Sequence, residues 1–244
     1  MQIHLISAFP NMFEGPLSES MMQRAKDRNI VDIHIHDLRD FTDDKHRSVD
    51  DYPYGGGPGM ILKPEPIFRC VEHIKEQLGD TPARVILTSP TGEMFTQAKA
   101  NEWAKEAAFI FICGHYKSTD ERVRELLITD EISIGDYVLT GGELPAMVMI
   151  DSIVRLMPGV LGDMDSATGD SFQGELLDHP HYTRPEDFRG HRVPDVLMSG
   201  HHEKIRQWRE MKSRERTAIR GATFGSTEPA EVKLPLPPDK PCED

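Results

Sequence analysis

A glycine-rich turn is the part of this sequence best suited to hold a small ligand. Residues 134–145 read as a short apolar strand that ends at Gly141 and Gly142 and passes directly into a helix. Glycines leave main-chain N–H and C=O groups uncovered, so a ligand can lie against the backbone. In an open α/β sheet, ligands bind at the carboxyl ends of the strands. The sequence therefore predicts a binding site at this turn.

Arg155 follows the same turn and stands in an apolar stretch. A guanidinium in apolar surroundings is costly unless an anion meets it, which makes Arg155 a candidate for contact with a negatively charged group. The alternative is an arginine that extends to water, and for an arginine considered alone this is the commoner case. The other glycine-rich segments of the chain favour the first interpretation.

A second glycine cluster lies at residues 50–60, where four glycines and two prolines follow two aspartates. It matches neither a dinucleotide fingerprint nor a P-loop. Its prolines restrict the loop, which could then fold closely over a flat ligand. Two other strand ends, at residues 87–92 and 113–116, also carry small or turn residues. If the strands are parallel, these ends converge with the turn at 134–145 into one pocket.

Alternating strand and helix signals predict the elements that position these segments. Apolar strand-like runs occupy residues 3–9, 30–38, 83–88, 108–113 and 132–139. Apolar residues from Ile67 to Leu78 recur at helical spacing, and Pro64 and Pro66 stand at the start of that helix. The fold class is therefore α/β, with a mostly parallel sheet covered on both faces. We expect a ligand-binding domain at 1–160, an interdomain loop at 161–175, a smaller, mainly helical domain at 176–225 and a proline-rich tail at 226–244.

Composition limits the classes of function. The chain of 244 residues has a net charge of −13, which argues against indiscriminate binding of nucleic acid. Its cysteines are odd in number and widely spaced, which suits a reducing, cytoplasmic location, and we expect no signal peptide and no membrane span. Residues 201–220 are nonetheless basic, which predicts either a solvated helix face or a helix that faces RNA. The cations of this segment are Lys204, Arg206, Arg209, Lys212, Arg214, Arg216 and Arg220.

Two further sets of side chains were weighed for chemistry. His34 and His36 alternate with apolar residues and should share the less buried face of one strand, where metal binding by the pair is the less common outcome. Asp170 lies in the expected interdomain loop, where an aspartate is usually a solvated turn residue.

Several motifs, in order along the chain, resemble the bacterial tRNA (guanine-N1)-methyltransferases of the SPOUT superfamily. The resemblance runs from Met1 to about Arg220. It rests on Tyr54-Gly55-Gly56-Gly57-Pro58-Gly59-Met60, Ser133-Ile134-Gly135-Asp136-Tyr137-Val138-Leu139, Gly141-Gly142-Glu143-Leu144-Pro145, Asp170-Ser171-Phe172 and Pro180-His181-Tyr182-Thr183-Arg184-Pro185. It implies a homodimer with a deep trefoil knot, and transfer of a methyl group from S-adenosylmethionine to N1 of the guanosine at tRNA position 37, just 3′ of the anticodon.

The resemblance also implies roles for individual residues. Asp170 would be the general base for the N1 proton, and Arg155 would stabilise the charge that develops on O6. Asp50, Tyr54, Gly59, Ser171, His181 and Arg184 would contact the tRNA anticodon stem-loop. The S-adenosylmethionine pocket would comprise Leu87, Ser89, Pro90, Gly114, Ile134, Gly135, Tyr137, Leu139, Gly141, Gly142 and Pro145.

The chain departs from this pattern at three positions. His115 and Lys117 stand where the best-known members carry arginine and glutamate, and Gly169 replaces a glutamate before the expected base. Both lost glutamates belong to the acidic cluster that those members link to magnesium. The metal ligands therefore cannot be assigned, and we expect a weaker dependence on magnesium, with Lys117 supplying part of the cation's charge.

Other functions remain as alternatives. One is an enzyme of the same superfamily that methylates a different nucleotide. Another is a catalytically silent RNA-binding protein that keeps the fold, although the presence of both Arg155 and Asp170 counts against it. A nucleotide-dependent oxidoreductase has little support, because the sequence lacks a dinucleotide fingerprint.

Overall fold

The computed structural model describes residues 1–161 and 170–224. The chain separates into two units, Met1–Ala167 and Thr168–Asp244, and each is described by itself. Most of the expected interdomain loop, including Gly169, and the expected proline-rich tail at 226–244 lie outside the described residues.

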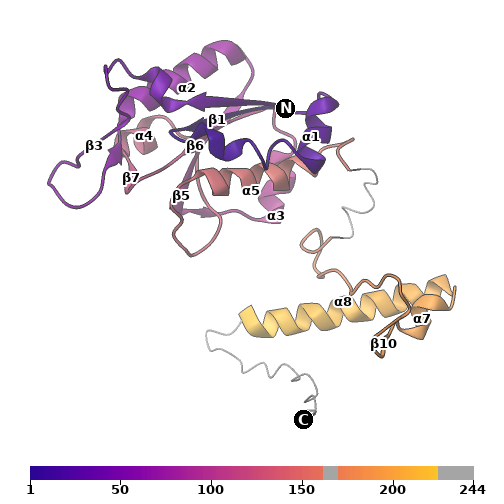
Figure 1. The fold of residues 1–244 in the computed structure, drawn as a ribbon. Helices are drawn as coiled ribbons and strands as arrows, with labels where there is room; N and C mark the ends of the chain where they lie inside the picture. The colour runs from indigo at the N-terminus through magenta and orange to yellow at the C-terminus, as the bar shows by residue number, and fades with distance from the viewer. Residues whose placement is uncertain (162–169, 225–244) are drawn as a thin grey trace, which may run out of the picture. The chain divides into compact units, whose positions relative to one another are not determined.

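A five-stranded parallel sheet forms the centre of the first unit (Figure 1). Its strand order is β2-β1-β6-β5-β8, and each neighbouring pair runs parallel. The strands are β1 (Gln2–Ser7), β2 (Asp32–Asp37), β5 (Ala83–Met94), β6 (Ala108–Cys113) and β8 (Asp130–Ser133). The predicted α/β class with a parallel sheet is confirmed.

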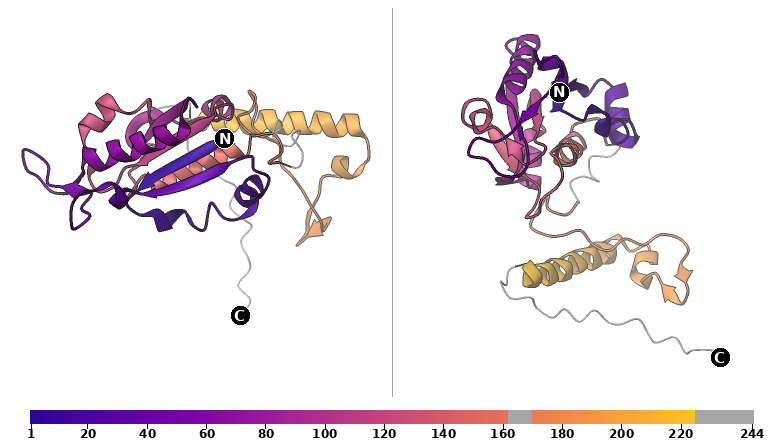
Figure 2. Two further views of the ribbon diagram at one scale, coloured as in Figure 1. Left: turned by 90° about the horizontal axis from the view of Figure 1, so that it is seen from above. Right: turned by 60° about the vertical axis from the view of Figure 1, so that its left-hand side comes forward.

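Helices cover both faces of this sheet (Figure 2). Along β6, Phe109 and Phe111 point into a core shared with α1, α3 and α5, whereas Ile110 and Ile112 point into a second core with α2. This follows from the two-residue period of a strand, which sends alternate side chains to opposite faces. Within residues 1–161, the helices are η1 (Pro10–Phe13), α1 (Ser20–Asp27), η2 (Leu38–Phe41), α2 (Pro64–Leu78), α3 (Gln97–Trp103), α4 (Glu121–Leu126) and α5 (Glu143–Val154).

Helix α2 forms where the apolar spacing predicted it. Pro64 and Pro66 lie in its first turn, where a missing N–H leaves no helical hydrogen bond unmade. Its buried stripe includes Ile67, Val71 and Ile74. Each such side chain contributes about 1.5–3 kcal/mol through removal from water. The helix ends at Gly79, whose φ of 57° suits a residue without a Cβ.

A small three-stranded sheet holds the second glycine cluster. It comprises β3 (Asp50–Asp51), β4 (Ile61–Leu62) and β7 (Ser118–Thr119), with β4 between its two neighbours. The loop between β3 and β4 projects away from the body of the unit (Figure 1). Its glycines at positions 55, 56, 57 and 59 all have positive φ, so the loop depends on residues without a side chain.

The structure corrects the predicted strand at 132–139. Strand β8 ends at Ser133, and residues 134–139 form a turn. The Ser133 hydroxyl donates to the Gly135 carbonyl over 3.1 Å and accepts from the Gly135 N–H over 3.2 Å. Side-chain hydrogen bonds of this kind compete with a strand ladder, which explains why an apolar run does not continue the sheet. Strand β5 instead extends to Met94, beyond the predicted end at 88.

In the second unit, residues 170–224 form a short hairpin and two helices. Strands β9 (Asp187–Phe188) and β10 (His191–Arg192) pair antiparallel, and α7 (Asp195–Met198) precedes α8 (His202–Phe224). The predicted basic helical segment at 201–220 coincides with most of α8. Among residues 1–161 and 170–224, no helix has the length and apolar character needed to cross a membrane.

Histidines of β1 and β2 stack at the edge of the central sheet. His34 and His36 share one face of β2, as predicted, and both rings stack on His4, with ring centroids 4.8 and 5.3 Å away. The His4 Nδ1 lies 3.0 Å from the His36 Nε2. Burial, followed by the charges of neighbouring histidines, lowers the pKa of both His4 and His36 from 6.5 to about 4.

Lowering the pH from 6.5 towards 4 is therefore expected to reduce the free energy of unfolding. In this window the unfolded chain binds protons at His4 and His36 that the folded protein does not bind. The nearly fully buried His4 accounts for up to about 1.4 kcal/mol per pH unit. Urea unfolding at several pH values measures the slope. His36→Gln should flatten it, and an unchanged slope in that variant would contradict the assignment.

Candidate functional site

A cavity of about 600 Å³ opens at the carboxyl ends of β5, β6 and β8, within the first unit. This volume lies in the usual range for small-molecule sites. The three strand ends that the sequence predicted to converge all contribute to it. Every residue that the resemblance assigns to the S-adenosylmethionine pocket lies in its wall: Leu87, Ser89, Pro90, Gly114, Ile134, Gly135, Tyr137, Leu139, Gly141, Gly142 and Pro145. Their contact with a cofactor stays a prediction.

Backbone segments are in direct contact at one wall of the cavity, which we call its floor and which contains Gly114, Gly141 and Gly142. The Gly142 N–H donates to the Gly114 carbonyl over 2.7 Å, and His115 forms an isolated antiparallel bridge with Gly141. A Cβ on Gly142 would overlap the Thr88 hydroxyl and lie 2.8 Å from the Gly114 nitrogen. The paired glycines are therefore required by close approach of three segments.

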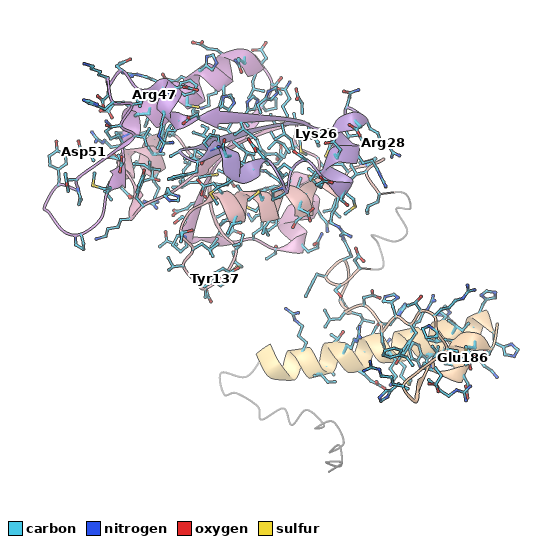
Figure 3. The ribbon with its side chains drawn as sticks, in the orientation of Figure 1. Lys26, Arg28, Arg47, Asp51, Tyr137 and Glu186 are labelled. Atoms are coloured by element: carbon cyan, nitrogen blue, oxygen red, sulfur yellow. The ribbon has the colours of Figure 1, made fainter. Side chains whose placement is uncertain are left out.

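A tight turn after β8 forms another side of the cavity. The Tyr137 N–H donates to the Gly135 carbonyl over 2.9 Å, and a Cβ on Gly135 would overlap the Tyr137 ring. Tyr137 projects from this turn at the edge of the unit (Figure 3) and remains 55% exposed. An exposed aromatic ring beside a cavity offers a surface for a flat ligand.

Glu143 places a fully buried carboxyl group next to the cavity. It is the first residue of α5, and its Oε1 accepts a hydrogen bond of 2.6 Å from the Ser7 hydroxyl at the end of β1. Its Oε2 lies 3.6 Å from the His115 Nδ1, and neither atom has a hydrogen-bond partner among the described residues. Burial and then the nearby Glu143 raise the pKa of the Cys113 thiol well above its usual value, so Cys113 stays neutral.

Three charged residues of the cavity wall, Glu121, Arg124 and Glu131, are paired with one another. Arg124 donates two hydrogen bonds of 2.9 Å to Glu131 and also contacts Glu121. The hydrogen bonds from Arg124, with smaller contributions from Ser89 and Thr91, lower the pKa of Glu131 to about 2. Sequence reasoning missed this pair, because its partners come from a helix and the following strand and no local motif joins them.

The two expected catalytic residues belong to different units. Arg155 is the C-terminal cap of α5, where its N–H donates to the Asp151 carbonyl over 3.1 Å. It thus lies just past Val154, the last residue of α5. Asp170 lies at the start of the described part of the second unit, where its carbonyl accepts from the Gln173 N–H over 3.3 Å. Their catalytic roles stay predictions.

The residues expected to contact tRNA also divide between the units. Asp50, Tyr54 and Gly59 surround the projecting loop of the first unit, and the Tyr54 side chain is fully exposed. In the second unit, the Ser171 hydroxyl accepts from the Asp178 N–H over 3.0 Å. His181 in turn lies 2.7 Å from Asp178, and Arg184 is exposed. Ser171 and His181 thus both contact Asp178.

Helix α8 is basic, but much of its charge is compensated. Ion pairs of 2.7–2.8 Å join Arg206 to Glu203, Lys212 to Glu215 and Arg214 to Glu210. Exposed pairs of this kind contribute little to stability, so their main effect is to reduce the positive field of the helix. Lys204 and Arg209 form no ion pair within the described part of the chain.

Comparison with known proteins gives consistent results. Residues 1–224 match a family model described as tRNA (Guanine-1)-methyltransferase TrmD. A protein of Anoxybacillus flavithermus is 59% identical over 220 residues, which cover 90% of this chain and 89% of the relative. Proteins of Geobacillus kaustophilus and Bacillus subtilis are 57% and 54% identical, with coverage of 90% of this chain and 89% and 90% of the relative.

All three relatives bear the name tRNA (guanine-N(1)-)-methyltransferase. The family match extends from the first strand through α8, so it includes the cavity as well as the basic helix. On this basis the chain belongs to the tRNA (guanine-1)-methyltransferase family.

Proposed function

We propose that this protein transfers a methyl group from S-adenosylmethionine to N1 of the guanosine at tRNA position 37, next to the anticodon, and does so in the cytoplasm. The observation that carries the proposal is the cavity at the ends of β5, β6 and β8. All the residues that the resemblance assigned to the cofactor line this single cavity, although they come from segments far apart in the sequence.

The cavity suits S-adenosylmethionine in shape. Glycines expose main-chain groups along its floor, as a ligand held mainly by backbone contacts requires. When bound, S-adenosylmethionine supplies a methyl group on positively charged sulfur.

The chemistry at guanine requires a base, because N1 carries a proton at neutral pH. In our proposal, the Asp170 carboxylate accepts this proton while N1 forms its bond to the methyl carbon and the carbon–sulfur bond breaks. The Arg155 guanidinium stabilises the negative charge that develops on O6. A positioned base contributes typically about 10²–10⁴ in rate, and a preorganised charge donor about 10²–10³.

Recognition of tRNA is assigned to the second unit and to the projecting loop of the first. Lys204 and Arg209 on α8, together with Arg184, supply positive charge for RNA phosphates. The exposed Tyr54 ring can stack on an unpaired base. A loop nucleotide is a suitable target, because its edges are not engaged in a helix.

We further propose that the protein acts as a homodimer with a knotted backbone. Support for the dimer comes from α5, where Leu144 and Val148 are 46% and 47% exposed and lie one helical turn apart on one face. Support for the knot comes from membership of the family alone. In a dimer, Asp170 of one protomer can complete the cavity of its partner.

Disruption of the α5 face should separate the protomers. The double variant Leu144→Glu/Val148→Glu is expected to elute as a monomer and to lose methylation, because burial of charge at an apolar interface is costly. Light scattering after size-exclusion chromatography measures the mass. Leu126→Glu, at the end of α4 on the other side of the sheet, is the control. A dimeric double variant would contradict this interface.

The cavity is poorly suited to a magnesium ion. Magnesium prefers oxygen ligands, but the cavity carboxylates of Glu121 and Glu131 are both paired with Arg124. Lys117 lies in the same wall, where its N–H donates to the Met60 carbonyl over 3.1 Å. No step of the proposed reaction therefore passes through magnesium.

Methylation should depend only weakly on magnesium and more strongly after removal of Lys117. Chelation is expected to slow single-turnover methylation of an anticodon stem-loop less than about tenfold, or 1.4 kcal/mol. Lys117→Ala should increase this dependence because it removes the local positive charge. Lys75→Ala, exposed on α2, is the matched control. An absolute magnesium requirement that Lys117→Ala leaves unchanged would overturn the prediction.

The proposed function is tested by methyl incorporation into unmodified tRNA, followed by nucleoside mass spectrometry of mapped fragments. N1-methylguanosine beside the anticodon is the expected product. A methyl group at another nucleotide would retain the enzyme class but change the substrate. Binding of S-adenosylmethionine in calorimetry without any methylation would favour the silent RNA-binding alternative.

A further inference from the structure

Asp178, His179 and His181 form a compact cluster in the second unit. One ligand atom from each residue lies within 4.8 Å of the others. The Asp178 Oδ2 is 2.7 Å from the His181 Nε2, and the Asp178 Oδ1 is 3.9 Å from the His179 Nε2. The two imidazole rings are 4.3 Å apart, with an interplanar angle of 43°. The cluster thus combines two imidazole nitrogens and a carboxylate.

The hydrogen bonding of His179 leaves its Nε2 available as a ligand. Its Nδ1 lies 3.2 Å from the Pro180 carbonyl, which can only accept, so the proton of the neutral ring resides on Nδ1. The Nε2, 3.9 Å from the Asp178 Oδ1, then carries the lone pair that can bind an ion. Metal-bound histidines commonly have this arrangement, in which the second nitrogen donates to a carbonyl.

Hydrogen bonds from other segments hold the backbone of the cluster in place. The Ser171 hydroxyl accepts from the Asp178 N–H over 3.0 Å, and Arg216 of α8 donates to the Asp178 carbonyl over 3.1 Å. Next to the cluster, the Leu177 N–H donates to the Thr217 hydroxyl over 2.8 Å. Because the backbone is fixed before any ion binds, little ordering is needed to form the site.

We propose that Asp178, His179 and His181 bind a single transition-metal ion of the zinc class. In a tetrahedral zinc site with bonds of about 2.0–2.1 Å, neighbouring ligand atoms are about 3.3 Å apart. The His181 Nε2 lies 2.7 Å from Asp178 Oδ2, the His179 Nε2 lies 3.9 Å from Asp178 Oδ1, and one ligand atom from each residue lies within 4.8 Å of the others, so rotations of the three side chains bring the ligand atoms to this spacing.

The ligand set discriminates between metals. Two imidazoles suit Zn²⁺, Co²⁺ or Ni²⁺, whereas Mg²⁺ requires oxygen ligands. The side chains of Asp178, His179 and His181 are 27%, 18% and 66% exposed, which leaves room for water at the remaining coordination position. When the ion binds, it replaces the Asp178–His181 hydrogen bond, and the neutral His181 ring carries its proton on Nδ1 instead.

The other histidine cluster of the protein lacks this capacity. The rings of His34 and His36 lie nearly parallel to that of His4, at 18° and 19°. The His4 Nδ1 and the His36 Nε2 are already joined by a hydrogen bond of 3.0 Å, and these three rings do not bring three ligand atoms within 4.8 Å of one another. This cluster therefore serves as an internal control for nonspecific binding by histidine.

Metal binding by the full-length protein, purified without a histidine tag, tests the site directly. Calorimetry with Zn²⁺ and the visible absorption of tetrahedral Co²⁺ should both give one ion per chain, with no comparable binding of Mg²⁺. His179→Ala and His181→Ala each remove one of three protein ligands and should weaken Zn²⁺ binding roughly tenfold or more, which is about 1.4 kcal/mol. His34→Ala should leave it unchanged.

The His181 side chain is 66% exposed, so His181→Ala should leave the fold intact, and circular dichroism confirms folding of the variant. Equal Zn²⁺ affinity in wild type, His179→Ala and His181→Ala would overturn the proposal. So would a wild-type protein that does not bind Zn²⁺ or Co²⁺. In that case Asp178 and His181 form only a hydrogen bond.

A functional consequence rests on the proposed function. Since His181 is proposed to contact tRNA, an ion held by His181 should raise the KM for tRNA while S-adenosylmethionine binding is unaffected. The binding test decides the metal site, and the kinetic test decides its effect on tRNA binding, so each can fail without the other. Zinc binding without an effect on KM would remove the consequence but keep the site, and absence of methylation in any condition would refute the proposed function alone.

Discussion

Asp170→Asn is expected to lower the rate of tRNA methylation by roughly 10²–10⁴, the usual contribution of a positioned general base. The substitution retains the size of the side chain but removes its ability to accept the N1 proton. Since Asp170 lies in a different unit from the cavity, binding of S-adenosylmethionine should remain close to that of wild type. Single-turnover methylation and calorimetry with the cofactor measure the two effects separately.

The matched control is Asp195→Asn, at the first residue of α7 in the same unit. It makes the same chemical change away from the expected active site and should leave the rate within about twofold, since a surface substitution changes free energy by at most about 0.5 kcal/mol. If both variants methylate at the wild-type rate, another group must accept the N1 proton. If Asp170→Asn loses cofactor binding as well, its role is structural rather than catalytic.

Gly142→Ala is expected to abolish S-adenosylmethionine binding and to destabilise the protein by roughly 1–3 kcal/mol or more, the typical cost of overpacking. The added methyl group would overlap the Thr88 hydroxyl and lie 3.0 Å from the Cys113 Cα. The backbone segments that contain Gly142 and Gly114 cannot move apart easily, because the Gly142 N–H donates to the Gly114 carbonyl over 2.7 Å. Thermal unfolding and calorimetry with the cofactor check the two effects.

Gly15→Ala provides the control for Gly142→Ala. A Cβ at Gly15 meets no atom within 4 Å, and its backbone lies outside the positive-φ region. Both variants reduce the entropy of the unfolded chain in the same way. The difference between their free energies of unfolding therefore measures the cost of the steric overlap at position 142. Equal unfolding temperatures and equal cofactor affinities for the two variants would show that the floor of the cavity can adapt.

The regular elements were predictable because their side chains carry a clear period. The strand at 108–113 and the helix that ends at Leu78 were located correctly, since β6 is buried on both faces and α2 has one apolar stripe. The predicted end of β8 was wrong, because the Ser133 side chain forms hydrogen bonds with the backbone of the turn that follows it. Local hydrogen bonds of this kind leave no trace in the periodicity of apolar residues.

The candidate site was predictable in part. Paired glycines marked the floor of the cavity, because only close approach of backbones requires them. Glu143 was not recognised as buried, since a glutamate at the start of a helix is normally explained by the helix dipole and left exposed. The pairing of Arg124 with Glu131 was also missed. The proposed domain boundaries and the catalytic roles of Arg155 and Asp170 stay predictions.

The glycine floor of the cavity has a consequence for inhibition and resistance. A compound that contacts a side chain can be evaded when that side chain mutates. At Gly142, however, even the smallest substitution meets Thr88, Gly114 and Cys113, and at Gly141 it meets Glu143 and His115. An inhibitor anchored on this stretch of main chain therefore leaves the enzyme few escape mutations, because a change that excludes the drug also damages the pocket needed for the native ligand.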